Sequence, residues 1–465
     1  MKRTFWKLAA LIAVVSLLAV SVISCPGEIT GGPEDDGLFN AGSGSGVLFD
    51  IRSPYQNVSW NWGQYKAALH THTINSDGSA TMEQILQLYY DLDYDIMGIT
   101  DHTWAEIHAR REPLNDPPGT PQRMYFNLIN KDVTNDTWTY TDNRTYNLTH
   151  ITQAQKEAFE AGTAASPTRT AGRGGMLMIP GSGELAPGGD PTPDEVNVFF
   201  WPDNVLAPNA WSVQLRAGLQ RVQSAGAIGF INHPGRSTHA MNFPNGTPAN
   251  QANIISPNNP NNQGTWIRRY ANLYMEFPIS IITGMEIFNR RDQDSVHDRV
   301  LWDNVNKLTI PEGRFVWGYA NDDMHGTSVS ATSSGAHINF NTFIMPANNM
   351  DNFRHAMING HSYMVTVVAF NEGVNRPADN DWKTRPSIQE IMFDKNSDNI
   401  TIIANNATRI DWISDGKIIF TEHQSYSTID LADPGIIDQV GSFVRANIIG
   451  TNGMAVIQPI STRRK

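Results

Sequence analysis

The 465-residue sequence holds one cysteine, Cys25, and so has no pair that could form an internal disulfide. A metal site built from cysteine thiolates is excluded for the same reason. Positive charge is also scarce, because 34 Lys and Arg face 46 Asp and Glu, giving a formal net charge of −12. A chain this acidic has no general attraction to nucleic acid, and we expect no nucleic-acid partner.

Several common signatures of catalysis are absent from the sequence as well. It contains no GxSxG nucleophile elbow, no P-loop, no CxxC cluster and no internal repeat. Nothing therefore indicates a covalent serine or cysteine nucleophile or a phosphate-cradling glycine loop. Hydrophobic residues make up 40% and charged residues 17%, as in ordinary globular proteins. The length predicts one large domain and a smaller one.

Only one long apolar run is present, at the N-terminus. Three basic residues precede residues 8–23, about 16 apolar positions, fewer than the roughly 20 that a membrane-spanning helix needs. Small residues then lead to Cys25. This arrangement resembles a bacterial lipoprotein signal, although a plain secretory signal with an incidental cysteine is the alternative. We expect residues 1–24 to be a signal peptide. The mature protein would be exported and anchored by lipid at Cys25, on the periplasmic or cell-surface side.

Composition divides the rest of the chain into regions. Residues 25–46, rich in Gly, Pro, Ser and acids, predict a flexible tether. Strand-like and helix-like segments alternate over residues 47–385, which is typical of a parallel sheet or barrel. Insertions near 103–174 and 235–280 interrupt the alternation and are expected to border a pocket. Residues 386–465 contain only short strand-like runs with turns, which predict an Ig-like β-sandwich whose partner is unknown.

Polar side chains recur at the ends of the strand-like runs. The carboxyl ends of the strands of an α/β barrel meet on one rim, and those of an open sheet meet in a crevice. Residues far apart in the sequence are therefore expected to converge. The set is His70, His72, Asp77, His102, Glu184, His233, Asp323 and His325.

The spacing of two pairs within this set favours a metal centre. His70 and His72 are two residues apart, as are Asp323 and His325, and such residues face the same side of a strand. Each pair can therefore approach one ion. A lone His-x-His is equally well explained by two solvated or core histidines. Eight such residues at strand ends, in order, favour divalent metal ions.

The motifs that carry these residues resemble those of the PHP family, the polymerase and histidinol phosphatase superfamily of metal-dependent hydrolases. The resemblance covers about residues 60–370, with every motif in order. The β region that follows makes the chain look most like the branch with carbaryl-type carbamate and ester hydrolases. The matching segments are HTHTINSDG at 70–78, ITDH at 99–102, PGSGE at 180–184, NHPG at 232–235 and NDDMH at 321–325.

The resemblance implies a distorted (β/α)7 barrel with two or three divalent ions, Zn, Mn or Fe. His70, His72, Glu184 and Asp323 would hold the first ion. Glu184 would bridge to a second ion on His233. Asp77, His102 and His325 would hold a third. The residues expected to act in catalysis are Asp77, His102, His233 and Arg236.

One position departs from the family pattern. The family often has a His before an apolar strand in a segment like His-Val-Asn, and this chain has Glu195-Val196-Asn197 there. A carboxylate can still bind the second ion, and it shifts the preference towards harder ions such as Mn²⁺ or Fe²⁺. Alternatively, Glu195 points away and that ion is weakly held or missing.

Other polar residues near the motifs leave two interpretations open. Asp101 and Asp322, each beside a candidate ligand, are supporting residues or turn acids. Glu286 could orient a ligand histidine or be purely structural. Arg236 and Arg290 could bind an anionic substrate group or form surface ion pairs.

The function expected from these residues is hydrolysis of a phosphoester by metal-activated water, with a small anionic, phosphorylated substrate. A carbamate, ester or amide substrate at the same site is the second hypothesis. A third hypothesis belongs to another class: a non-catalytic, metal-containing lipoprotein whose β domain binds a glycan or a protein.

Overall fold

The structure is a computed structural model, and its described residues lie in one compact unit, Gly37–Lys465. The predicted signal peptide, the predicted tether with Cys25, Arg236 and most of both insertions lie outside them. Among the described residues, no helix is long and apolar enough to cross a membrane. The described ranges are 47–74, 76–102, 137–139, 145–147, 151–185, 195–202, 214–235, 263–292, 297–329, 335–378, 381–394 and 396–465.

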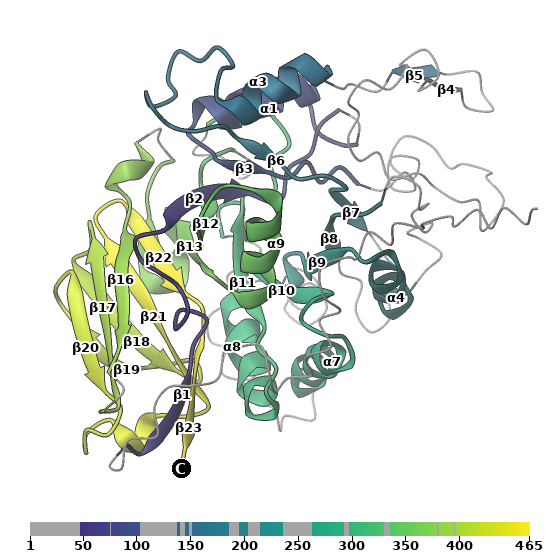
Figure 1. The fold of residues 1–465 in the computed structure, drawn as a ribbon. Helices are drawn as coiled ribbons and strands as arrows, with labels where there is room; N and C mark the ends of the chain where they lie inside the picture. The colour runs from purple at the N-terminus through teal and green to yellow at the C-terminus, as the bar shows by residue number, and fades with distance from the viewer. Residues whose placement is uncertain are drawn as a thin grey trace, which may run out of the picture. The chain divides into compact units, whose positions relative to one another are not determined.

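The largest sheet has eleven strands and joins the two ends of the described chain. The first strand pairs with the last, so both ends lie side by side (Figure 1). Along the sheet the order is β1 (Phe49–Arg52), β23 (Ile460–Arg464), β21 (Phe443–Gly450), β22 (Gly453–Ile457), β13 (Ser362–Thr366), β12 (Asn339–Met345), β2 (Gly63–Ala68), β3 (Ile96–Met97) and β6 (Leu177–Met178). β18 (Arg409–Ser414) pairs with β21 and β19 (Lys417–Glu422).

A second sheet has five strands and carries several of the predicted ligands at one edge. Its order is β11 (Trp317–Asn321), β10 (Ile282–Asn289), β9 (Ile228–Ile231), β8 (Val196–Phe199) and β7 (Gly183–Leu185). β9, β10 and β11 are parallel, whereas β8 runs antiparallel to β7 and β9. Two isolated bridges, Thr71 with Met324 and His102 with Glu184, connect the two sheets at the edge that carries the predicted ligands.

Three smaller sheets complete the strands. They are β16 (Ser387–Phe393), β17 (Asn399–Asn405) and β20 (Tyr426–Asp430); β14 (Val368–Ala369) with β15 (Val374–Asn375); and β4 (Thr137–Thr139) with β5 (Thr145–Asn147). Ile402 and Ile429 from the three-stranded sheet share one core cluster with Trp412 and Ile448 from the largest sheet. Two β layers therefore enclose the C-terminal core.

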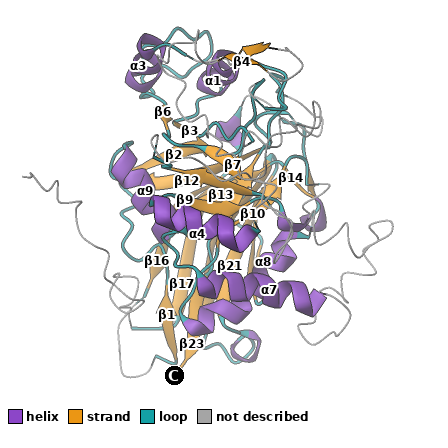
Figure 2. Ribbon diagram, turned by 90° about the vertical axis from the view of Figure 1, so that its right-hand side faces the viewer, coloured by secondary structure: helices purple, strands orange, loops and turns teal. Residues whose placement is uncertain are grey.

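Helices cover the second sheet and one end of the first. They are α1 (Met82–Asp91), α3 (Gln153–Ala161), α4 (Leu215–Ala225), α7 (Gln263–Glu276), α8 (Asp298–Thr309) and α9 (Met350–Asn359). Short 3-10 turns are η3 (Ile310–Glu312), η4 (Phe370–Glu372), η5 (Trp382–Thr384) and η6 (Ile437–Gln439). Figure 2 shows α4, α7 and α8 as neighbours, and apolar side chains from all three join one core cluster with β9 and β10.

The structure confirms a mixed α/β fold and some local predictions. Within the region where the sequence predicts alternating helices and strands, Thr81 and Gln84 form the capping box of α1, and its apolar face, including Ile85 and Tyr89, is buried. The finer fold predictions are not confirmed, because the described helices are few and β8, β12 and β13 have antiparallel neighbours. The Ig-like C-terminal domain and the boundary at residue 386 stay predictions, and β13 pairs with β22 across that boundary.

Candidate metal centre

Strand direction explains why the candidate ligands meet at one edge. His70 and His72 follow β2, His102 follows β3, and His233 follows β9. Glu195 instead precedes β8, but β8 runs antiparallel to β9, so its start lies beside the end of that strand. The structure thus brings together every predicted ligand. They are His70, His72, Asp77, His102, Glu184, Glu195, His233, Asp323 and His325.

The tightest group surrounds the His-x-His pair. The Nε2 atoms of His70 and His72 lie 3.1 Å apart. Asp323 Oδ1 lies 3.4 Å from the first and 3.3 Å from the second. Glu184 adds Oε1 at 3.4 Å from His70 Nε2 and Oε2 at 3.6 Å from His72 Nε2. Two ligand atoms, each about 2.1 Å from a tetrahedral zinc ion, lie about 3.4 Å apart, so this group fits one ion.

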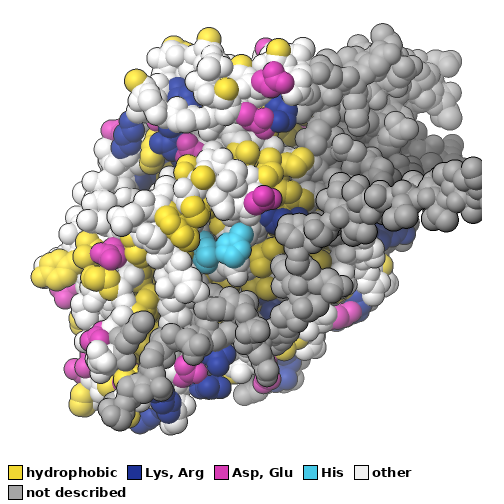
Figure 3. Space-filling view, viewed as in Figure 1, with side chains coloured by type: hydrophobic (Ala, Val, Ile, Leu, Met, Phe, Trp, Pro, Cys, Tyr) yellow, Lys and Arg dark blue, Asp and Glu magenta, His cyan; other side chains and the backbone are white. Residues whose placement is uncertain are grey.

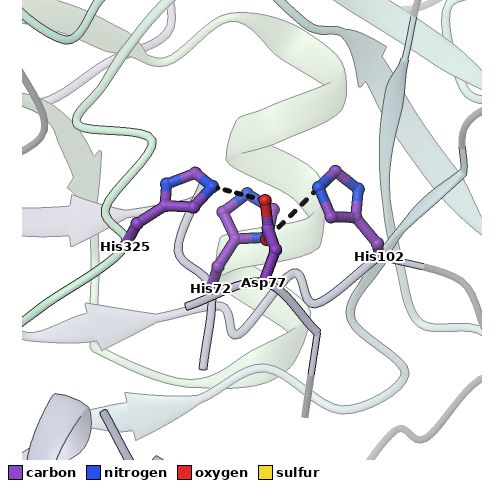
Figure 4. A group of neighbouring side chains, drawn as sticks. All are labelled: His72, Asp77, His102 and His325. Atoms are coloured by element: carbon purple, nitrogen blue, oxygen red, sulfur yellow. Dashed lines mark hydrogen bonds and ion pairs between the residues drawn. The ribbon is translucent and has the colours of Figure 1, made fainter. Parts of the chain in front are cut away.

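A second group is centred on Asp77, which lies between two histidine rings (Figure 4). Its Oδ2 is 3.0 Å from His325 Nε2, and its Oδ1 is 3.4 Å from His102 Nε2. His72 Nδ1 lies 3.5 Å from the same Oδ1. These three histidines and Asp77 place one ligand atom each within 4.8 Å of the others, which is compatible with the ion that the sequence analysis numbers third.

Glu195 turns into the site rather than away from it. Its Oε2 lies 3.3 Å from His233 Nε2, and it forms a ligand-like group with His102 and Glu184. Glu184 Oε2 is buried and accepts no hydrogen bond of ordinary geometry from the described residues. It lies 2.8 Å from His102 Nδ1. A buried carboxylate oxygen next to the imidazoles of His72 and His102 fits a metal ligand, because imidazole and carboxylate are donors that divalent metals bind.

The titration of these groups reflects an excess of carboxylates. Burial lowers the pKa of His70, but neighbouring carboxylates, first Glu286, outweigh it and hold that pKa well above its usual value. Burial raises the pKa of Asp323 and of Glu184, yet the adjacent histidines hold both well below their usual values. Without a metal ion, protons on histidine therefore balance the carboxylates. A divalent cation would replace those protons.

Two candidate ligands have unusual backbone conformations. Asp323 has a φ of +48° and His233 a φ of +24°, in the left-handed region that glycine favours. Such residues cost of order 1–3 kcal/mol and concentrate at functional sites. The loop between His72 and Asp77 is also tight, since Gly78 N donates to Thr73 O at 3.0 Å. A Cβ on Gly78 would lie 2.7 Å from His72 O, so only glycine fits there.

Supporting acids fix the loops that carry the ligands. Asp101 accepts hydrogen bonds from Thr73 N at 2.6 Å and from the hydroxyls of Thr73 and Ser76. Asp322 accepts three backbone N–H bonds from residues 337–339. Burial, partly offset by those bonds, raises the pKa of Asp322 to about 6. Both acids hold loops, and so they match the supporting interpretation that the sequence left open.

Asparagines that the sequence analysis did not single out form a layer beneath the candidate ligands. Asn232 donates to Glu184 Oε1, and its Nδ2 lies 2.9 Å from Asn197 Oδ1. Asn197 Nδ2 donates to Leu69 O at 2.9 Å, while Leu69 N donates to Asn321 Oδ1 at 3.2 Å. The residue before His70 is thus held by side chains from the other sheet. These asparagines could have been recognised in the sequence because they lie within one or two residues of the candidate ligands.

Of the two arginines proposed for substrate binding, one is placed. Arg236 lies outside the described residues. Arg290 follows β10, and its Nε lies 2.8 Å from Asp323 Oδ2. Its side chain is 28% exposed, so the guanidinium lies at the border of the group. The predicted ion pair therefore exists, but its partner is a candidate metal ligand.

Comparisons with known proteins add little. No protein-family model matches the chain, and no curated protein does. One solved structure, a two-domain protein from Bacteroides vulgatus containing a predicted PHP-like metal-dependent phosphoesterase, is similar at 12% sequence identity with a TM-score of 0.37. The match covers 86% of this chain and 96% of that one. A similarity with these values of identity and TM-score indicates neither a family nor an activity for this chain. The function is therefore inferred from the residues of the site.

Proposed function

We propose that this protein is a metal-dependent hydrolase that cleaves a phosphoester with metal-activated water. The observation that carries the proposal is the ligand-like spacing around His70 and His72, with Asp323 and Glu184 completing a set suited to one ion. A buried set of imidazoles and carboxylates at this spacing is the donor chemistry that Zn, Mn and Fe bind.

The chain's residues have distinct parts in this proposal. Glu184, Glu195 and His233 offer a second ion position, and Asp77, His102 and His325 a third. His102 borders both, because Nδ1 is near Glu184 and Nε2 is near Asp77. When bound, divalent ions lower the pKa of a coordinated water and polarise a phosphoryl oxygen. The side chains of Glu195 and His325 are only 22% and 20% exposed, so the protein limits the water that reaches the centre.

Arg290 supports an anionic substrate. Its Nε is engaged by Asp323, and the rest of its fork lies at the exposed border of the site. A guanidinium binds phosphate oxygens through paired N–H donors. On the face drawn in Figure 3, Lys and Arg side chains are scattered among acids. The phosphate group of a small substrate is therefore assigned to Arg290 and the ions together.

The test is hydrolysis by the purified protein loaded with Mn²⁺ or Zn²⁺. A phosphomonoester, a phosphodiester and a carbamate ester would be offered in parallel, and bound metal counted by mass spectrometry. His72→Ala should reduce kcat/KM beyond the roughly 100-fold seen for residues that only support ligands. The matched control is His355→Ala, which removes an exposed histidine of α9 and should leave kcat/KM and the amount of bound metal unchanged.

Each other result selects a different function. Turnover of the carbamate ester alone favours carbonyl chemistry and removes the phosphoester proposal. A metal-loaded protein that hydrolyses none of the three favours a non-catalytic binding lipoprotein. Unchanged activity and metal content in His72→Ala would refute the site.

Three finer predictions belong to this proposal. We propose that the five-stranded sheet and the strands of the largest sheet before residue 386 form a distorted (β/α)7 barrel, since the bridges at Thr71 and His102 connect the two sheets beside the site. The C-terminal strands would then form an Ig-like domain. Membership of the carbaryl-type branch is proposed from the motif order and the β region. Export with a lipid anchor at Cys25 is proposed from the sequence alone.

A further inference from the structure

Glu286 makes a set of contacts unlike those of the candidate ligands. It lies in β10, is fully buried, and receives four contacts from nitrogen atoms. Oε1 lies 2.8 Å from both His70 Nδ1 and Asn321 Nδ2. Oε2 accepts from His233 N at 3.0 Å and from Asn289 Nδ2 at 2.9 Å. One carboxylate therefore joins the ends of β2, β9, β10 and β11.

These contacts determine which atom of His70 faces the metal centre. An ionised carboxylate only accepts, and three of its partners are donors, so the fourth contact is satisfied when His70 Nδ1 also carries a proton. That leaves Nε2 as the ligand atom. Nε2 is the atom that lies near His72, Glu184 and Asp323.

The geometry also separates Glu286 from the ligands. Its 2.8 Å distance to His70 Nδ1 is a hydrogen-bond length and is shorter than the roughly 3.4 Å between two ligands of one tetrahedral ion. Both oxygens are already engaged. The pairing of β10 with β11 is irregular between Glu286 and Phe288, and such bulges redirect side chains beside active sites.

We propose that Glu286 is a positioning residue of the metal centre, which fixes His70 with Nε2 inward and, through the same carboxylate, anchors the turn that carries His233. These two histidines belong to different ion positions in the proposed function, on which this inference rests. Loss of Glu286 should therefore weaken the binding of more than one ion. The property that Glu286 affects in this proposal is the affinity of the protein for metal, which can be measured without any catalytic reaction.

The test is Zn²⁺ affinity, measured by competition with a chromophoric chelator. Glu286→Gln preserves the size of the side chain but replaces one carboxylate oxygen with an NH₂ group, which cannot accept hydrogen bonds from the donors on that side. We therefore expect the affinity for Zn²⁺ to be 10- to 100-fold weaker. Asp303→Asn is the control, because Asp303 is also a buried carboxylate but pairs with Arg445 between α8 and β21. Its Zn²⁺ affinity should equal that of the parent. Unchanged affinity in Glu286→Gln, or an equal loss in both variants, overturns the proposal.

A second measurement on the parent protein decides the matter even if Glu286→Gln does not fold. In the Zn²⁺-loaded, ¹⁵N-histidine-labelled protein, His70, identified by comparison with His70→Asn, should carry its proton on Nδ1 and the metal on Nε2. Metal on Nδ1 overturns the proposal. Neither readout requires a substrate. A protein with this pattern that hydrolyses nothing would refute the hydrolase while leaving the role of Glu286 intact.

Discussion

Two regions of this protein bury carboxylates, and they balance the charge in different ways. Around α8, arginines face the acids. Arg299 binds Asp292 at 2.7 and 2.9 Å and Glu372 at 2.7 and 2.9 Å. Arg445 binds both oxygens of Asp303 at 2.7 Å. Asp292, Glu372 and Asp303 each have a fixed cation within the chain, which is the arrangement of a structural ion pair.

The metal centre buries more acid than the described basic side chains can balance. Arg290 is the described arginine in contact with one of its carboxylates, and it reaches only Asp323. The other contacts come from neutral donors such as Asn232 and Asn289 and from histidines, and the histidines are cationic only when protonated. Buried charge without a fixed partner is costly, so an exchangeable cation is the natural complement. The comparison separates acids that stabilise the fold from acids that surround the candidate metal site. The acids of the centre are Asp77, Glu184, Glu195, Glu286 and Asp323.

The largest expected effect is that of metal removal. Chelation should abolish hydrolysis and lower the free energy of unfolding, because the acids of the centre lose their cation. At free metal 1,000-fold above Kd, the lost stabilisation is about 4 kcal/mol. Thermal unfolding with and without chelator measures it, and added Zn²⁺ or Mn²⁺ should restore both properties. A protein whose activity and melting temperature ignore the chelator would contradict the comparison.

Asp303→Asn should produce the converse result. It removes the carboxylate charge that pairs with the buried Arg445, and loss of one partner of a buried pair costs about 3–5 kcal/mol. Urea unfolding would show this loss in both metal-free and metal-loaded protein. Metal affinity should be unchanged, since Asp303 touches no residue of the centre. Weakened metal binding in this variant would show that the two regions are not independent.

pH should act in opposite directions on the metal-free and the metal-loaded protein. The pKa values of His70 and His325 are raised, because carboxylates outweigh burial. Their contribution to metal-free stability is therefore complete below the unfolded pKa of about 6.5 and is lost as pH rises through the folded values. The lowered pKa values of Asp323 and Glu184 give stability that is lost only in acid, below about pH 4.

Metal binding should show the reverse trend, because ligands must be deprotonated. Zn²⁺ affinity should rise by about tenfold per pH unit for each proton displaced, until the folded pKa values are passed. Urea unfolding of chelated and Zn²⁺-loaded protein at about pH 6 and about pH 9 measures both trends. Parallel pH profiles in the two forms would show that these histidines are not ligands.

Local patterns in the sequence were enough to predict which side chains lie together at one edge of the sheets. His70, His72, Asp323 and His325 were recognised because polar residues at strand ends and i, i+2 spacing are visible in a single segment. The capping box of α1, Thr81 with Gln84, is a pattern of the same local kind. These predictions depend on chain direction and periodicity alone.

Features that depend on distant partners were not predictable in the same way. Glu195 precedes its strand, and only the antiparallel direction of β8 brings it to the site. Glu286 lies within an apolar run, and its four partners come from residues 70, 233, 289 and 321. The pairing of β13 with β22, which joins the C-terminal strands to the first sheet, leaves no mark in either segment.

The smallest predicted effect concerns Arg290, where removing a cation should help metal binding. Around α8, losing an arginine destabilises the fold. At the centre, Arg290 Nε occupies Asp323 Oδ2 and adds positive charge beside the proposed ions. Its partial exposure limits that interaction to about 1 kcal/mol, so Arg290→Met should bind Zn²⁺ up to about fivefold more tightly. Inhibition by inorganic phosphate should weaken in the same variant, because the anion loses its guanidinium.

Arg291→Met is the matched control, since that neighbouring side chain instead donates to Asn375 Oδ1 at 2.8 Å. Chelator competition and phosphate inhibition should both match the parent in this variant. If Arg290→Met binds Zn²⁺ more weakly than the parent, Arg290 stabilises the site as the α8 arginines stabilise theirs, and the distinction between the two regions fails at this position. If Arg290→Met instead binds Zn²⁺ more tightly and is inhibited less by phosphate, the Arg290 guanidinium has two separate effects. It repels the metal ions, and it attracts the anionic substrate.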